Sequence, residues 1–514
     1  MPNSEDAATS RVPRPLTVAS SILAPLCFAV FPALSLFAQN QTDVAVSVLW
    51  PPLVAGVVVT LALYGLFLLL TRRAAKAGAL TSLAVVFVLY FGILHENVSL
   101  GLSERAFFVL WAALFAAAAY LVVRRGRELL GVTLFAAVGA AVLAIPAAAR
   151  VASYQSAHPP ISLSDARLWP SALPAPRPAA GAARPDIYVL IPDDYARPDV
   201  LRRTLHYDDS AFLAALKARG FVVSPNARSP YSDSESNTAA ELNMDYIDQL
   251  PKILGAKSED VRPVKRLAQD NRAAALLKPL GYHYSHLDTD EVTFGGSNPA
   301  ISPLAPPDSF ANLWMQKSVL RLLGGALGFN KSATNQRFRD SIQSQFRALE
   351  DTTRRPGPKF VVFHTLLPHD PYVYSDTGAP ATFPGHTDAD LGSKLGMPYY
   401  VRQLQYLNGK LLHAIDAIRS NSSTPPVIVL MSDEGFQADP GTTGEAIATD
   451  IRVKGMLALS LPGADRPTAV QPPNSVNALR YVFNRSFGTH YPMLRSASYP
   501  EGDLPYQFDE MHVR

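Results

Sequence analysis

Only one cysteine, Cys27, occurs among the 514 residues, and it lies inside a long apolar run. A single cysteine cannot form an intramolecular disulfide, and it leaves the rest of the chain without a thiolate zinc site or a thiol nucleophile. The sequence also lacks dense clusters of Lys and Arg, and its net charge is only +3. Because a nucleic-acid groove needs such clusters, no nucleic-acid partner is expected.

Long apolar runs are absent beyond the first third of the chain. Five stretches there approach the roughly 20 residues that a helix needs to cross a bilayer: residues 16–38, 45–71, 79–95, 106–123 and 130–149. None has an ionisable residue near its centre, which argues against a transporter or channel. The sequence therefore predicts a short N-terminal segment, residues 1–15, followed by a bundle of five transmembrane helices over residues 16–150.

Basic residues flank these spans on one side. They precede the first span and follow the second and the fourth, whereas segments 39–44 and 96–105 contain only Arg105. Basic loops are retained in the cytoplasm. The N-terminus is therefore predicted to be cytoplasmic, and after five crossings the chain beyond Arg150 is predicted to lie outside.

The remaining chain is predicted to hold a linker and an α/β domain. Residues 151–185 are rich in Pro, Ala and Ser without a repeat, which is typical of an extended linker. Beyond them, helical patterns alternate with short apolar runs at residues 187–191, 359–367, 426–431 and 456–462. Runs that are apolar on both faces indicate a sheet covered on both sides. Residues 186–514 are predicted to fold around a doubly wound, mostly parallel sheet.

Acidic residues and histidines gather at the ends of three of these runs. They are Asp193, Asp194, His364, His369, Asp433 and Glu434. In open parallel sheets, functional groups lie beyond the carboxyl ends of the strands. A hard divalent cation prefers carboxylate oxygens and accepts imidazole. Taken singly, however, an Asp after a strand more often forms a turn or caps a helix.

A run of hydroxyl residues, within segment 229–247, precedes an alanine-rich helical pattern. A serine at a helix N-terminus can help to hold a phosphate or sulfate oxyanion, and it can act as a nucleophile if a cation stabilises its alkoxide. The alternative is N-capping, the usual role of Ser and Asp before a helix. The residues alone leave both interpretations open.

The order of these motifs resembles the sulfatase-like branch of the alkaline phosphatase superfamily. A strand ending in Asp is followed by a serine at a helix start, by LLPHDPY at 366–372 and by SDEG at 432–435. Five spans followed by such a domain are similar to lipoteichoic acid synthases and phosphoethanolamine transferases. The resemblance covers essentially all of residues 186–498. It implies a sheet of alkaline phosphatase type and a bacterial cytoplasmic membrane protein with this domain on the periplasmic or extracellular side.

The same resemblance implies a metal site. It makes Asp193 and Asp433 ligands of one divalent cation, with Asp194 as a further acid. At the position of Glu434 the family usually has His. A carboxylate there would make the site all-oxygen, which favours Mn²⁺, Mg²⁺ or Ca²⁺ over Zn²⁺.

The resemblance places the nucleophile, which also contacts the metal, at Ser234. His369 is expected to contact the substrate or protonate the leaving group, and His364 is a second candidate for substrate binding. The segment SDSES at 232–236 lacks the C-x-P-x-R pattern of formylglycine sulfatases or its serine equivalent. Sulfate ester hydrolysis is therefore not expected.

Together these features predict a metal-dependent phosphoryl-group transferase or phosphodiesterase. The expected donor is a membrane lipid or a lipid-linked molecule, and the expected acceptor is an envelope glycan or a lipid. The alternative is a catalytically silent scaffold or envelope-binding protein that kept the fold, and Glu434 in place of His is the feature that supports it.

Overall fold

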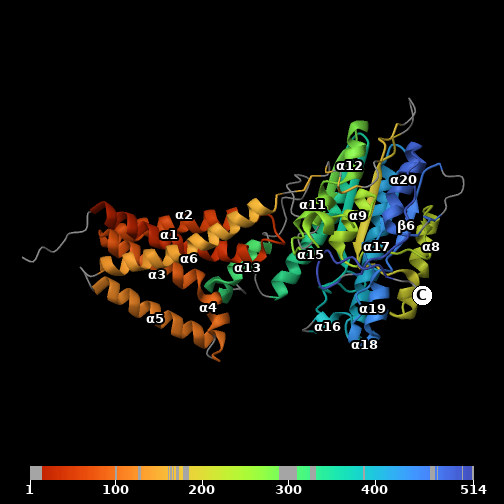
Figure 1. The fold of residues 1–514 in the computed structure, drawn as a ribbon. Coiled ribbons are helices and arrows are strands. Elements are labelled where there is room, and N and C mark those ends of the chain that lie inside the picture. Colours follow the sequence, from red (N-terminus) through yellow and green to blue (C-terminus); the bar gives the residue numbers. More distant parts are fainter. Residues whose placement is uncertain are drawn as a thin grey trace, which may run out of the picture. The chain divides into compact units, whose positions relative to one another are not determined.

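The computed structural model describes most of the chain, in two compact units (Figure 1). One unit is Met1–Pro159 with Pro307–Thr334, and the other is Pro160–Pro306 with Asn335–Arg514. The described residues are 14–98, 101–124, 129–159, 161–162, 165, 167–169, 173–177, 184–288, 309–323, 331–385, 388–463, 469–471, 473–500 and 502–511.

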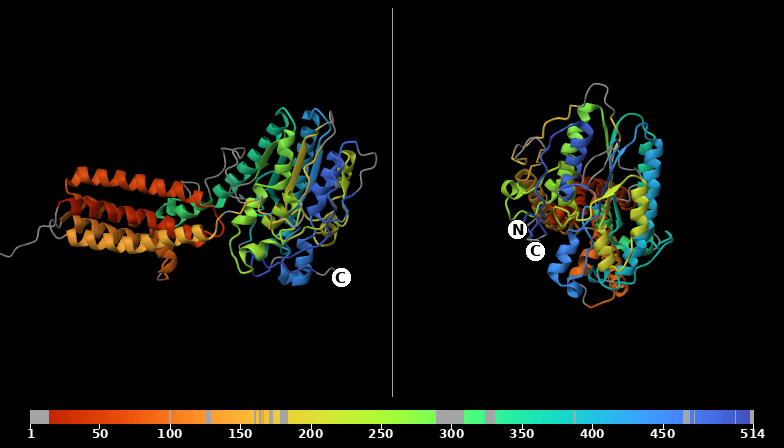
Figure 2. Two further views of the ribbon diagram at one scale, coloured as in Figure 1. Left: turned by 45° about the horizontal axis from the view of Figure 1, so that its top comes forward. Right: turned by 90° about the vertical axis from the view of Figure 1, so that its right-hand side faces the viewer.

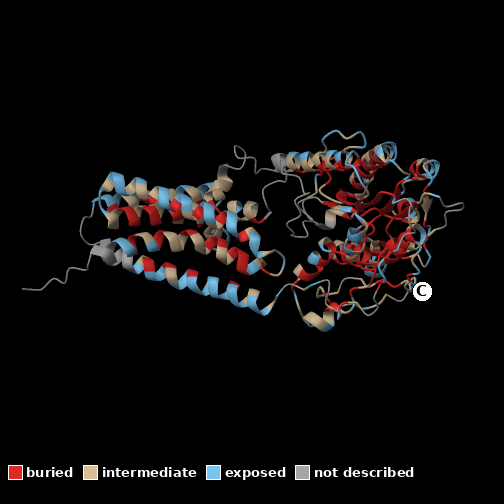
Figure 3. Cartoon of the chain, turned by 90° about the horizontal axis from the view of Figure 1, so that it is seen from above, coloured by how far each residue is buried: buried red, intermediate tan, exposed pale blue. Residues whose placement is uncertain are grey.

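The first unit is a bundle of apolar helices. Its helices from the N-terminal part of the chain are α1 (Arg14–Asn40), η1 (Val46–Leu49), α2 (Trp50–Thr71), α3 (Ala74–Leu89), α4 (Phe91–Asn97), α5 (Glu104–Arg124) and α6 (Leu129–Ala157). Among the residues that the structure describes, four helices are long and apolar enough to cross a membrane, and α3 with α4, bent by 57°, would make a fifth span. Figure 3 shows many exposed residues along these helices, and they include Leu69, Phe135 and Ile145. The predicted helical N-terminal region is confirmed, and α6 extends through residues 151–157, which were expected in the linker.

A segment from later in the chain packs with these helices. It consists of α13 (Ser309–Gln316) and η4 (Val319–Leu323), which belong to the first unit. Phe310 is buried, and its ring lies edge-on to that of Phe37 in α1, with ring centroids 6.1 Å apart. Gly92 of α4 donates its N–H to the carbonyl of Lys317 at 2.9 Å, and a Cβ on Gly92 would lie only 2.5 Å from that oxygen. The sequence placed residues 309–323 in the extracytoplasmic domain, whereas the structure groups them with the bundle.

Ion pairs add to this contact. Lys317 Nζ lies 2.5 Å from Glu96 Oε2, and Arg321 Nε lies 2.5 Å from Glu104 Oε1. Arg321 also donates to His95 Nδ1 at 3.0 Å. The polar residues at the end of α4 and the start of α5 therefore bind this segment.

The second unit contains a six-stranded sheet in the order β2-β6-β5-β1-β4-β3. The strands are β1 (Ile187–Asp193), β2 (Val222–Val223), β3 (His283–Leu287), β4 (Lys359–Pro368), β5 (Val427–Met431) and β6 (Leu457–Ser460). β3, β4, β1 and β5 run parallel, whereas β6 is antiparallel to both β5 and β2. The predicted α/β fold is confirmed, with the difference that the apolar run at 456–462 forms an antiparallel strand.

Helices cover both faces of this sheet (Figure 2). Those in the second unit are α7 (Pro198–Arg203), α8 (Ser210–Ala218), α9 (Ser234–Asn243), α10 (Leu250–Leu254), α11 (Arg262–Gln269), α12 (Arg272–Leu277), η2 (Lys278–Leu280), α15 (Lys331–Thr353), α16 (Asp388–Leu391), α17 (Met397–Asn421), α18 (Pro440–Thr443), α19 (Glu445–Arg452), η5 (Ser475–Asn477) and α20 (Ala478–Phe487). Tyr188 and Leu190 of β1 pack with α8, α15 and α17, whereas Ile187 and Val189 pack with α9, α12 and α20. Successive strand residues point to opposite faces, so every residue of β1 is buried.

Candidate metal centre

The predicted metal residues meet at the carboxyl ends of β1, β4 and β5. Asp193 is the last residue of β1, and the β1 residue Ile191 pairs in register with His364 of β4. The ligand atoms of Asp193, His364 and Asp433 all lie within 4.8 Å of one another, and so do those of Asp193, Asp194 and Glu434. Two possible ligand clusters therefore share Asp193, and all of their members are buried.

His364 bridges two carboxylates. Its Nε2 lies 3.2 Å from Asp433 Oδ2, and its Nδ1 lies 3.3 Å from Asp288 Oδ1. Burial lowers the pKa of this histidine, but the two carboxylates outweigh that effect and hold the pKa well above its usual value. Asp288 directly follows β3, a strand that was not predicted from the sequence. Since a metal ligand must be neutral imidazole, a cation would compete with a proton for His364.

Ser234 is the first residue of α9, but it is not the cap of that helix. Asp233 takes that role, because its Oδ1 accepts the N–H of Ser236 at 2.8 Å. The Ser234 hydroxyl instead donates to Glu434 Oε1 at 3.2 Å and lies 3.5 Å from Asp193 Oδ1. Asp233 is therefore the N-cap of α9, whereas the hydroxyl of the next residue, Ser234, lies at the acids. The nucleophile role of Ser234 stays a prediction.

Arg452, the last residue of α19, was not among the residues predicted from the sequence. Its Nη1 contacts Asp194 Oδ1, and its Nη2 contacts Glu434 Oε1. Arg452 precedes β6, and Leu457 at the start of β6 pairs with Met431 at the end of β5. β6 runs antiparallel to β5, so the residues that precede β6 lie at the same edge of the sheet as the residues that follow β5. Arg452 reaches the acids in this way.

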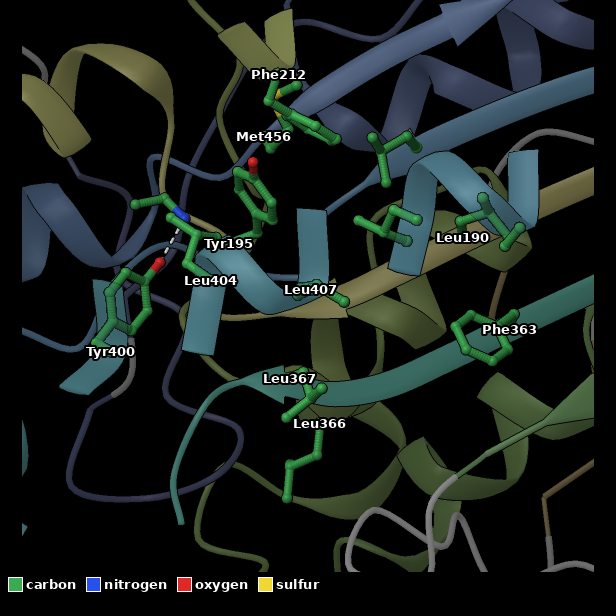
Figure 4. Close-up of a cluster of buried hydrophobic side chains, with 14 of the residues drawn as sticks. Leu190, Tyr195, Phe212, Phe363, Leu366, Leu367, Tyr400, Leu404, Leu407 and Met456 are labelled. Atoms are coloured by element: carbon green, nitrogen blue, oxygen red, sulfur yellow. Dashed lines mark hydrogen bonds between the residues drawn. The ribbon is translucent and has the colours of Figure 1, made fainter. Parts of the chain in front are cut away.

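Asp194 is held through its backbone as well as through Arg452. Its φ of 59° is left-handed, a conformation that Asp tolerates better than most residues. Tyr400 of α17 donates its hydroxyl to the Asp194 carbonyl at 2.7 Å and accepts the Ala196 N–H at 3.1 Å, the bond drawn in Figure 4. This clamp fixes the turn that carries the Asp194 carboxylate.

Burial and crowding set the protonation of the acids. Burial, together with Asp433, raises the pKa of Asp193 well above its usual value. Burial also raises the pKa of Asp194 and Glu434, although Arg452 holds both down in part. For Asp433 the burial effect is outweighed by His364, and its pKa is lowered. Like charges this close are tolerated only if protons or cations neutralise them.

His369 lies beside the possible ligand cluster of Asp193, Asp194 and Glu434. Its Nδ1 is 2.9 Å from Asp370 Oδ1, and its Nε2 is 3.9 Å from Asp194 Oδ2. Burial lowers its pKa, but Asp194 and Asp193 raise it more, so the pKa lies well above its usual value. The protonated ring can donate a proton.

The donor set fits a divalent cation. Asp193, His364 and Asp433 supply two carboxylates and one imidazole, each 0–2% exposed. Glu434 Oε2 is buried and has no hydrogen-bond partner among the residues that the structure describes. His364 was predicted as a substrate contact, and its place in a ligand cluster removes the reason for expecting an all-oxygen site. Imidazole is accepted by zinc and by the harder ions, so this donor set suits both.

Comparisons with known proteins return solved structures that include the following three. The C-terminal periplasmic domain of EcEptC from Escherichia coli is 13% identical, with a TM-score of 0.40 over 65% of this chain and 98% of that one. The integral membrane lipooligosaccharide phosphoethanolamine transferase A from Neisseria meningitidis is 14% identical, with a TM-score of 0.37 over 88% of this chain and 89% of that one. A 2-O GAG sulfatase is 14% identical, with a TM-score of 0.37 over 60% and 72% of the two chains.

These are the kinds of protein that the sequence motifs resemble. No family model and no curated protein sequence matches the chain. At 13–14% identity and TM-scores of at most 0.40, the likeness concerns the fold and assigns no activity.

Proposed function

We propose that this protein is a metal-dependent phosphoryl-group transferase or phosphodiesterase, bound to the bacterial cytoplasmic membrane and acting at its outer face. The observation that carries the proposal is the position of the Ser234 hydroxyl. It lies between Glu434 Oε1 at 3.2 Å and Asp193 Oδ1 at 3.5 Å, and Asp193 belongs to both possible ligand clusters. A nucleophile of a metal-assisted reaction needs this proximity to the ligands of the ion.

The chain's own residues account for the proton transfers. Ser234 Oγ attacks the substrate phosphorus and passes its proton to Glu434, whose Oε1 already accepts its hydrogen bond. The bond from phosphorus to the leaving oxygen breaks, and His369 donates a proton to that oxygen. An acceptor hydroxyl or water then attacks the phosphoserine and gives its proton to His369, while the bond from phosphorus to Ser234 Oγ breaks. Ser234 takes back its proton from Glu434, which regenerates the site.

A divalent cation would be held by Asp193, His364 and Asp433, with Asp194 and Glu434 as the other predicted ligands. When bound, it supplies positive charge that stabilises the serine alkoxide and the phosphoryl oxygens. The first turn of α9, a helix of 10 residues, adds the positive end of its dipole at Ser234.

The proposed donor is a membrane lipid or a lipid-linked molecule, and the proposed acceptor is an envelope glycan or a lipid. The apolar helices of the first unit support this assignment, because they would keep the enzyme in the same surface as a lipid donor. A catalytically silent scaffold is the second candidate. The observation that favours it is the Arg452 pairing, which offsets part of the charge of Asp194 and Glu434 without a metal ion.

Mass spectrometry of the full-length protein tests the proposal. We expect incubation with membrane phospholipids and Mn²⁺ to leave a phosphoryl adduct on Ser234 of the wild type. Ser234→Ala should lose both adduct and turnover while it still binds metal, because the carboxylates remain. Ser236→Ala, two residues further along the same helix, is the matched control and should retain the adduct.

Two results would contradict the proposal in different ways. Full turnover by Ser234→Ala would move the nucleophile to Ser232, Ser236 or Thr238. A wild-type protein that binds no ion at millimolar Mn²⁺, Mg²⁺, Ca²⁺ or Zn²⁺ would favour the scaffold.

A further inference from the structure

Arg452 makes polar contacts with all three of its guanidinium nitrogens. Nη1 contacts Asp194 Oδ1 and Nη2 contacts Glu434 Oε1. Nε donates to the Ser232 carbonyl at 3.3 Å, and Nη1 also lies 3.4 Å from the Gly435 carbonyl. The planar donor fork of arginine suits such a bridge between two carboxylates.

The atoms that Arg452 occupies are those that a cation would need. Asp194 and Glu434, with Asp193, form the second of the two possible ligand clusters. We infer that Arg452 takes the place of a second divalent cation in this cluster, so that the protein binds one ion, at Asp193, His364 and Asp433. This inference rests on the proposed function in one respect, the binding of a metal ion at the first cluster.

A physical consideration supports it. Arginine does not lose its proton in proteins, so a cation can enter the second cluster only by displacing a whole charged side chain, which is 18% exposed. The positive charge of Arg452 also offsets part of the negative charge of Asp194 and Glu434, which reduces the attraction that this cluster offers to a second ion.

The same contact positions a group beside the nucleophile. Glu434 Oε1 accepts from Arg452 and from the Ser234 hydroxyl at 3.2 Å. Arg452 is therefore a positioning residue for Ser234, acting through Glu434. In this arrangement Asp194 and Glu434 pair with Arg452 and are not ligands of the ion.

Metal stoichiometry of the full-length protein, measured by elemental analysis and by titration with Mn²⁺, tests this inference. We expect one Mn²⁺ per wild-type chain and two per Arg452→Gln chain, because the neutral amide leaves Asp194 and Glu434 without a counter-charge. The matched control is Arg219→Gln, which removes an arginine whose partner is the exposed Asp416, and it should bind one ion. Two ions in the wild type, or one in Arg452→Gln, would overturn the inference and leave the proposed enzyme intact. No ion in any variant would overturn both.

A second variant keeps the test decisive if Arg452→Gln does not fold. Asp194→Asn should bind one Mn²⁺ with an affinity within about 100-fold of the wild type, because Asp194 is not a ligand of the single ion and loss of an outer partner of a metal ligand costs roughly 10- to 100-fold in affinity. A loss well beyond about 100-fold in Asp194→Asn would therefore show that Asp194 holds the metal and that Arg452 does not exclude it.

Discussion

Asp209 gives a pH-dependent prediction for stability. This carboxyl group is 4% exposed and lies in a hydrogen-bonded cluster. Its Oδ1 accepts from Asn408 Nδ2 at 2.8 Å, and its Oδ2 lies 3.0 Å from the Tyr195 hydroxyl. The same hydroxyl lies 2.7 Å from Asn408 Oδ1. Because a hydroxyl has only one proton, all three contacts can be satisfied together only if protonated Asp209 donates to Tyr195 and Tyr195 donates to Asn408.

The magnitude follows from the pKa. Burial is the main cause that raises the pKa of Asp209 from 3.8 to about 7. At 1.36 kcal/mol per pKa unit, this shift corresponds to about 4 kcal/mol. The folded state holds the proton more tightly than the unfolded state does. The contribution of Asp209 to the free energy of unfolding is therefore fully present below about pH 4 and is lost as the pH rises through about 7.

Asp209→Asn mimics the protonated carboxyl group and should remove this loss. We expect the free energy of local opening around α8, measured by hydrogen exchange on the full-length protein, to be similar in the two proteins at pH 4. By pH 8 the variant should exceed the wild type by about 4 kcal/mol. Asp248→Asn, at an exposed acid, is the control, and because it keeps Asp209 it should lose the same stability between pH 4 and pH 8 as the wild type. A variant that is less stable than the wild type at pH 8 would refute the protonated network.

Three further predictions concern the site and the membrane. Asp433→Asn should lose both the bound ion and activity, because Asp433 lies in the His364 cluster, and metal retention measured by elemental analysis would contradict this. Glu434→His should leave the order of Zn²⁺ and Mn²⁺ affinities unchanged, because Glu434 pairs with Arg452 rather than with the ion; a shift toward zinc would show that residue 434 is a ligand of the ion, since imidazole is the softer ligand. A reporter that is active only outside the cytoplasm should be active when fused after residue 184 and inactive when fused after Arg73, and the reverse result would refute the topology.

The core of the α/β domain could be predicted from the sequence because its signals are local. β1, β4 and β5 are apolar on both faces, and each is buried along its whole length. Their ends carry Asp193, His369 and Asp433, so a rule about strand ends was enough to select these residues. The alternation of these strands with helical patterns was enough to predict that helices cover both faces of the sheet.

The residues that were missed depend on information that is not local. β3 is an edge strand with the sequence HYSHL, exposed at its first residue, so it lacks the apolar run of a central strand, and Asp288 was missed with it. Arg452 reaches the site only because β6 is antiparallel, and strand direction cannot be read from four residues. The packing of α13 with the bundle joins residues more than 200 positions apart, and no periodicity in either segment signals it.

That packing has a consequence for biosynthesis. Synthesis starts at the N-terminus, and parts of a chain fold in that order. The surface around Phe37 and Glu96 therefore exists before Phe310 and Arg321 leave the ribosome. The last step in building the first unit is the return of a late loop to helices that are already in place. If this loop failed to return, Phe310 and the neighbouring Trp314 would be exposed to proteases. This would happen even though every helix from the N-terminal part was already complete.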